Sequence, residues 1–125
     1  ILIADDEPYI LHVLALKLRN AGYEVLTAVD GEEAIAVALV ERLDLIITDF
    51  QMPRRNGLEV CMQIAARLGR KIPTMLVTAR DFDLDPEDIR KAGVEAVLAK
   101  PFSPREVVCE VERILSGAAS AEPAV

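Results

Sequence analysis

The sequence predicts an α/β fold in three layers, a doubly wound parallel sheet of five strands with five helices on its two faces. One observation is that short apolar runs alternate five times with segments whose apolar residues recur at helical spacing. Such alternation is typical of a parallel sheet joined by right-handed helical crossovers. A second observation is that acidic residues end two of the apolar runs. Ligands of open α/β folds bind at the edge of the sheet that is formed by the carboxyl ends of the strands.

The predicted strands are short, and three of them are nearly continuous Leu, Ile and Val. Runs of this kind suit strands that helices cover on both faces. The five segments are Ile1–Ala4, Glu24–Ala28, Leu45–Thr48, Thr74–Val77 and Ala96–Ala99.

The predicted helices have apolar stripes and recognisable ends. In the first one, Ile10, Leu14 and Leu18 recur every four residues, which gives one face that packs on the sheet. Capping side chains that start helices occur at Asp30 with Glu33, at Asp85 before Pro86, and at Ser103 with Glu106. In the last predicted helix, Val107, Val111 and Leu115 form the apolar stripe. Glycines that favour helix ends are Gly22 and Gly93.

Length and composition predict one globular domain. The chain has 125 residues; the domain is expected over residues 1–115, and the small polar tail at 116–125 is interpreted as a linker. A net charge of −7 argues against nucleic-acid binding by this segment. No apolar run reaches the roughly 20 residues of a membrane span. Cys61 and Cys109 lack metal or redox spacing, which favours a cytoplasmic protein with reduced thiols.

Asp5, Asp6 and Asp49 are the candidate metal ligands. The first two follow one predicted strand, and the third follows another. If these strands are neighbours, three carboxylates converge, and two unit charges ~4 Å apart repel by roughly 4 kcal/mol at an effective dielectric near 20. A site whose ligands are all oxygen atoms favours a hard cation, which here is Mg²⁺ or, as a substitute, Mn²⁺. Asp49 alone is explained equally well as a turn cap, but the trio indicates a metal site that handles phosphate.

Two further side chains end predicted strands. Lys100 in isolation is most simply a surface lysine, but beside three carboxylates its ammonium offsets their repulsion and binds a phosphoryl oxygen. The Lys100-Pro101 bond is a candidate cis peptide. Thr78 needs no special explanation in a strand, although its hydroxyl lies at the same edge and suits a phosphate on Asp49.

These landmarks occur together in one known family. They are Asp5-Asp6, Asp49 followed by Met52-Pro53 and Asn56-Gly57, Thr78-Ala79, and Lys100-Pro101-Phe102. With them, the chain resembles the receiver domain of two-component response regulators from Ile1 to about Leu115. The resemblance implies a flavodoxin-like receiver fold. It also implies a signalling domain that catalyses only its own phosphorylation and dephosphorylation and is not a turnover enzyme.

The resemblance implies a role for each matching position. Asp49 would accept a phosphoryl group from a phosphohistidine on a sensor histidine kinase or a phosphotransfer protein. Asp5, Asp6 and Asp49, with the backbone carbonyl of Gln51, would hold the metal ion. Lys100 would pair with the phosphoryl oxygens.

Further positions would modulate this site. Thr78 and the amide of Ala79 would close onto the phosphoryl group after transfer. Arg80 occupies a variable position that flanks the phosphate in receivers. Val97 departs from the family, which commonly has an aromatic residue there, so the usual coupling between threonine and an aromatic ring is in doubt. Arg54-Arg55 is interpreted as a solvated pair, with contact to an acidic kinase surface as the alternative.

The resemblance also implies partners. The linker-like tail suggests an output domain after this segment. The face of the last two helices and the last strand is interpreted either as a solvated surface of mixed charge or, by the resemblance, as the site of a homodimer or of contact with an output module. Its charged residues are Arg90, Lys91, Glu95, Glu112 and Arg113.

Two other functions remain open on the residues. A phosphatase of the haloacid dehalogenase type needs Asp-x-Asp after its first strand, whereas this chain has Asp5-Asp6-Glu7 and then Pro8. A pseudo-receiver would use the same fold only for binding, and Val97 leaves room for it.

Overall fold

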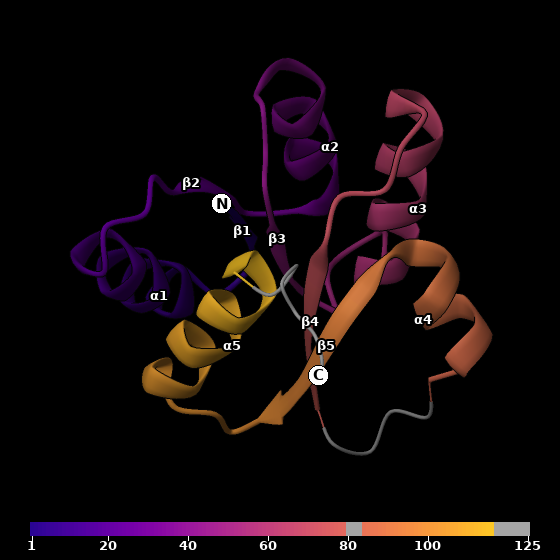
Figure 1. Ribbon diagram of the computed structural model, residues 1–125. Helices are drawn as coiled ribbons and strands as arrows, with labels where there is room; N and C mark the ends of the chain where they lie inside the picture. The colour runs from indigo at the N-terminus through magenta and orange to yellow at the C-terminus, as the bar shows by residue number, and fades with distance from the viewer. Residues whose placement is uncertain (80–83, 117–125) are drawn as a thin grey trace.

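The computed structural model describes residues 1–79 and 84–116, in which strands and helices alternate (Figure 1). The strands are β1 (Leu2–Ala4), β2 (Leu26–Ala28), β3 (Ile46–Asp49), β4 (Thr74–Ala79) and β5 (Val94–Lys100). The helices are α1 (Pro8–Asn20), α2 (Gly31–Val40), α3 (Gly57–Leu68), α4 (Pro86–Ala92) and α5 (Pro104–Ser116). The predicted fold class is therefore confirmed.

The element boundaries differ slightly from the predicted ones. Strand β2 begins at Leu26 and not at Glu24, whereas β5 extends beyond its predicted segment at both ends. A register shift opposite Thr74 and Met75 accommodates this longer strand. Helix α5 runs through Ser116, the first residue of the predicted tail, and residues 117–125 lie outside the described part of the chain.

All strand pairs are parallel, in the order β2-β1-β3-β4-β5. Strand β1 lies beside β3, with Ala4 opposite Thr48 in the register. The residues that follow these two positions are Asp5 and Asp49. Because parallel neighbours end at the same edge, the strand order brings both acidic residues to one place.

The sheet lies between two layers of helices (Figure 1). Helices α1 and α5 cover one face, and α2, α3 and α4 cover the other. Alternate residues of β1 and β3 serve the two layers, so Ile3 and Ile47 pack towards α1 and α5, whereas Leu2 and Ile46 pack towards α2 and α3. All four are fully buried, which fixes the register of the two central strands.

Helix caps form mostly as predicted. Ser103 and Glu106 make the two reciprocal hydrogen bonds of a capping box at the start of α5. Asp30 accepts from the amide of Glu33, but the carboxylate of Glu33 accepts from Val29 and not from Asp30. Helix α4 ends at Gly93, whose φ of 81° is in the left-handed region. Across residues 1–79 and 84–116, none of the helices combines the length and apolarity needed to span a membrane.

Candidate functional site

The three predicted carboxylates lie together at the carboxyl edge of the sheet. Asp5 and Asp6 directly follow β1, and Asp49 is the last residue of β3. One oxygen from each side chain can be chosen so that all lie within 4.8 Å of one another. Asp5 and Asp49 are buried, whereas Asp6 is exposed. This arrangement has the oxygen ligands and the open side that a hard divalent cation requires.

Burial disfavours the ionised form of two of these carboxylates. It raises the pKa of Asp5 to about 6, although the amide of Glu7 donates to Asp5 Oδ1 at 2.8 Å and opposes the shift; the nearby charge of Asp49 adds to it. Burial also raises the pKa of Asp49. Lys100 and the Gln51 amide, which donates to Asp49 Oδ1 at 3.3 Å, stabilise the ionised carboxylate and oppose this shift. A bound cation would relieve both carboxylates.

Lys100 brings a positive charge to the trio. It ends β5, and its Nζ lies 3.2 Å from Asp49 Oδ2 and 3.4 Å from Glu7 Oε1. Burial alone would lower the pKa of Lys100, but the hydrogen bond to Asp49 and the charges of Asp49, Asp5 and Glu7 outweigh it, so the pKa is raised. The following bond, Lys100-Pro101, is cis. The ammonium is therefore a fixed cation of the site at neutral pH.

Glu7 is the site residue that the sequence interpretation missed. A signal existed, because Glu7 directly follows Asp5-Asp6 at the predicted edge of the sheet. An open pocket of about 480 Å³ contains this side chain; it is lined by Asp6, Glu7, Asp49, Gln51, Met52, Pro53 and Lys100.

Thr78 and Val97 lie on β4 and β5. The hydroxyl of Thr78 donates to the carbonyl oxygen of Ala79 at 3.2 Å, and in the described part of the chain it bonds to none of the three carboxylates. Thr78 pairs in register with Ala99, next to Lys100, so it lies near the site. Val97 is 42% exposed on the β5 surface. Arg80 lies outside the described residues.

The loop between β3 and α3 is held in place on both sides. Arg54 and Arg55 form ion pairs with the start of α2: Arg54 Nη2 is 3.5 Å from Asp30 Oδ2, and Arg55 Nε is 2.5 Å from Glu32 Oε2. The Arg54 side chain is exposed, in agreement with its predicted solvation, whereas that of Arg55 is partly buried. The amide of Gly57 donates to the Phe50 carbonyl oxygen at 2.8 Å.

Gly57 sits so close to β3 that a side chain has no room. A Cβ there would lie 2.6 Å from the carbonyl oxygen of Asp49 and 3.2 Å from the Cα of Phe50. Helix α3 starts at this glycine, and Asn56 and Glu59 form a capping box at its first turn. The contact fixes the backbone that carries Asp49.

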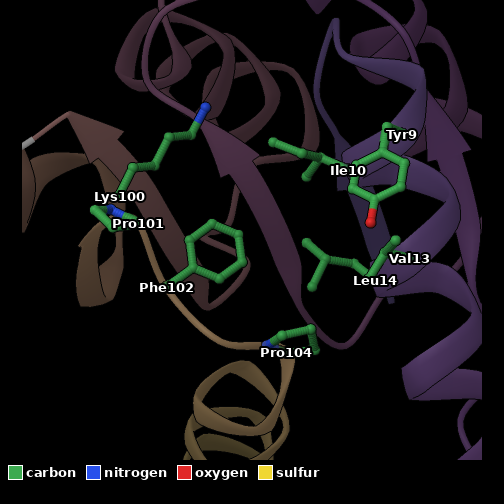
Figure 2. Close-up of a pocket in the computed structure, with 8 residues that line it drawn as sticks. All are labelled: Tyr9, Ile10, Val13, Leu14, Lys100, Pro101, Phe102 and Pro104. Atoms are coloured by element: carbon green, nitrogen blue, oxygen red, sulfur yellow. The ribbon is translucent and has the colours of Figure 1, made fainter.

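An apolar groove adjoins the acidic pocket. It has a volume of about 550 Å³ and runs between α1 and the segment after β5, with Lys100 at one end. Figure 2 shows Phe102 opposite Ile10 and Leu14 of α1, and Tyr9 at the outer side of the groove. Tyr9 is 78% exposed. The groove places apolar surface beside the charged site.

Comparison with known sequences identifies the family. The family model of the response regulator receiver domain matches residues 1–112. The chain is 40% identical over 123 residues to the alkaline phosphatase synthesis transcriptional regulatory protein PhoP of Bacillus subtilis (strain 168), covering 98% of this chain and 51% of that protein. It is 38% identical over 115 residues to the transcriptional regulatory protein ResD of the same organism, covering 92% of this chain and 47% of that protein. The chain thus spans about half the length of these curated relatives.

Solved structures agree in fold. The chemotaxis response regulator CheY4 of Vibrio cholerae superposes with a TM-score of 0.80 at 34% identity, over 91% of this chain and 96% of that one. The response regulator TrrA of Thermotoga maritima, solved in complex with Mg²⁺-BeF, superposes with a TM-score of 0.76 at 32% identity, over 91% and 96% of the two chains. The chain therefore belongs to the receiver domains of two-component response regulators, a family of signalling domains.

Proposed function

We propose that Asp49 is the phosphoacceptor of this domain, and that a phosphohistidine of a sensor histidine kinase or a phosphotransfer protein is the donor. The observation that carries the proposal is the position of Asp49 between two further carboxylates and the ammonium of Lys100, 3.2 Å away. A carboxylate oxygen of Asp49 attacks phosphorus in line, and one P–O bond forms as the P–N bond to histidine breaks. The domain then slowly hydrolyses its own acyl phosphate.

The residues fit a bound Mg²⁺, or Mn²⁺ in its place. Asp5, Asp6 and Asp49 would hold the ion together with the backbone carbonyl of Gln51. Three carboxylate oxygens within 4.8 Å, two of them from buried side chains, support this set because their charges need a cation. When bound, the ion neutralises charge on the phosphoryl oxygens. The relative TrrA was solved in complex with Mg²⁺-BeF, which supports Mg²⁺ as the ion.

Other residues would stabilise the phosphorylated state. The Lys100 ammonium pairs with a phosphoryl oxygen, as its contact with Asp49 already suggests. The Thr78 hydroxyl would leave the Ala79 carbonyl and donate to the phosphoryl group, beside the amide of Ala79. Arg80, two residues after Thr78 in the sequence, would act as a modulating residue. Val97 cannot provide the movement of a large ring, so the signal would leave through shifts of helices.

The partners follow from the family. Relatives about twice as long act as transcriptional regulators, which supports an output domain joined by the tail at 116–125. The segment itself, with a net charge of −7, would not bind nucleic acid. We place the protein in the cytoplasm with its kinase. A homodimer would form through α4, β5 and α5, and the exposed Val97 of β5 belongs to this set of elements.

Labelling with acetyl phosphate and Mg²⁺ tests the acceptor. Intact mass should increase by one phosphoryl group, and Asp49→Asn should abolish the increase. Asp44→Asn is the matched control, because Asp44 is exposed at the opposite edge of the sheet. Labelling that persists in Asp49→Asn contradicts the proposal. Sustained turnover of p-nitrophenyl phosphate would favour a phosphatase. A protein that is neither labelled nor able to bind Mg²⁺ would favour a pseudo-receiver.

Sedimentation velocity tests the dimer. Beryllofluoride with Mg²⁺ should shift the sedimentation coefficient from monomer to dimer in a concentration-dependent way. A monomer unchanged by saturating beryllofluoride rules out this face as a phosphorylation-dependent interface.

A further inference from the structure

Glu7 stands at the start of α1 but does not cap it. It occupies the N-cap position with extended backbone angles, φ −96° and ψ 110°, and within the described structure its side chain makes no capping hydrogen bond. An N-cap side chain ordinarily accepts from an amide of the first turn, and short polar residues do this best. Here the carboxylate turns the other way, and Glu7 Oε1 lies 3.4 Å from Lys100 Nζ.

The backbone and the side chain of Glu7 contact two different parts of the site. Its amide donates to Asp5 Oδ1 at 2.8 Å, whereas its carboxylate contacts the ammonium of Lys100. Glu7 and Lys100 are 93 residues apart in the sequence, so the contact depends on the completed sheet. Glu7 therefore connects the residue after β1 with the end of β5.

The ammonium of Lys100 is shared between two carboxylates. Asp49 Oδ2 is 3.2 Å from Nζ and Glu7 Oε1 is 3.4 Å from it. Among the described residues that line this pocket, Lys100 is the one cation, and Asp6, Glu7 and Asp49 are anions. A phosphoryl group that enters the pocket must compete for the ammonium with a carboxylate already in contact with it.

We propose that Glu7 is a positioning residue, which holds the Lys100 ammonium between phosphorylations and gives it up to the phosphoryl group. This inference rests on the proposed role of Asp49. The Glu7 side chain is 59% exposed and that of Lys100 27% exposed. Exposed pairs of this kind are weak, so the contact restrains phosphoryl binding by a factor of about two to five.

Beryllofluoride, a phosphoryl mimic, gives an equilibrium test on the 125-residue chain. In Mg²⁺ and at low ionic strength, Glu7→Gln should bind beryllofluoride about two- to fivefold more tightly than the wild type. The gain should shrink in high salt, which screens exposed charges. Glu41→Gln removes the same charge from the far end of α2 and should match the wild type. Equal or weaker binding by Glu7→Gln overturns the proposal.

A double-substitution cycle separates contact from net charge. Labelling by acetyl phosphate is followed by intact mass, which detects slow reaction over long incubation. Glu7→Gln should accelerate labelling in the wild type and leave the rate unchanged in a Lys100→Gln background, because the competitor acts through the ammonium. An equal acceleration in both backgrounds overturns the positioning role.

The two proposals fail in different ways. If Asp49 is not the acceptor, either the wild type takes no phosphate or Asp49→Asn is labelled as well as the wild type. If only the role of Glu7 is wrong, the wild type responds to both reagents and Glu7→Gln responds identically.

Discussion

Lys100 Nζ lies 3.2 Å from Asp49 Oδ2, although the two residues end strands that are not neighbours. Strand β4 lies between β3 and β5, so the two backbones are separated by roughly 10 Å, or two strand spacings. The long stem of the lysine crosses the end of β4 and delivers a charge to the cluster at β1 and β3. A shorter cation at this position could not make the contact.

Lys100→Gln should slow labelling by acetyl phosphate by about 10²-fold, the usual effect of removing one donor that stabilises a developing anion. The fold should persist, because Lys100 is at the end of a strand and the layers on both faces of the sheet are intact. Labelling kinetics and circular dichroism measure the two effects. Lys17→Gln removes an exposed lysine from α1 and should behave as the wild type. An unaltered labelling rate in Lys100→Gln would remove this residue from the site.

Asp5→Asn should stabilise the domain without metal at neutral pH. Burial raises the folded-state pKa of Asp5 to about 6, whereas an unfolded chain has a value near ~3.9. Between these values the folded state binds more protons than the unfolded state, so this group makes stability fall as pH rises from about 4 to about 6. The loss remains at neutral pH.

Urea unfolding of both proteins from pH 4 to pH 7.5, in a chelator, isolates the effect of Asp5. The advantage of Asp5→Asn should grow across the window from about 4 to about 6 and then stay constant. An advantage that is independent of pH would mean that the ionisation of Asp5 carries no cost.

Mg²⁺ affinity should decline as the pH falls through about 6. Asp5 must lose its proton to act as a ligand, and its raised pKa of about 6 sets the upper end of the decline. Below that value the affinity should approach a tenfold loss for each pH unit, at about one proton released per ion bound. Isothermal titration in two buffers of different ionisation enthalpy measures both quantities. A constant affinity from pH 7.5 to pH 5 would exclude Asp5 as a ligand.

Gly57→Ala should impair both stability and phosphorylation. The new Cβ would lie 2.6 Å from the carbonyl oxygen of Asp49 and 3.0 Å from Leu76 Cδ1. Overpacking of this kind costs about 1–3 kcal/mol of unfolding free energy, and relief of the clash moves the backbone of Asp49. Chemical denaturation and acetyl phosphate labelling give the two readouts.

Gly69→Ala is the matched control for that substitution. Gly69 ends α3 with a φ of 74°, and a Cβ there would meet no atom within 4 Å. Strain in the left-handed region costs about 1–2 kcal/mol, so this variant should lose stability but label at the rate of the wild type. Equal labelling rates in both variants would show that the contact of Gly57 does not position Asp49.

Local signals in the sequence anticipated most of the architecture. Continuous apolar runs such as Leu45–Thr48 predicted buried strands, and side chains such as Ser103 predicted where helices begin. The ends of β2, β4 and β5 were predicted less well. Strands β2 and β5 are at the edges of the sheet, where one neighbour and partial exposure weaken the apolar signal that marks a strand. Strand β4 continues past its predicted end at Val77 through Thr78 and Ala79, where the run of large apolar residues has already stopped.

The sequence by itself determined which side chains stand at the ends of the strands. Asp5 and Asp49 are acidic residues at the ends of apolar strands, and this local pattern was enough to predict a cluster. The tertiary structure decided which side chains from distant parts of the chain contact one another. Glu7 and Lys100 meet across 93 residues, and Arg54 and Arg55 pair with the start of α2, because side chains distant in sequence find partners only after the sheet and its crossovers have assembled.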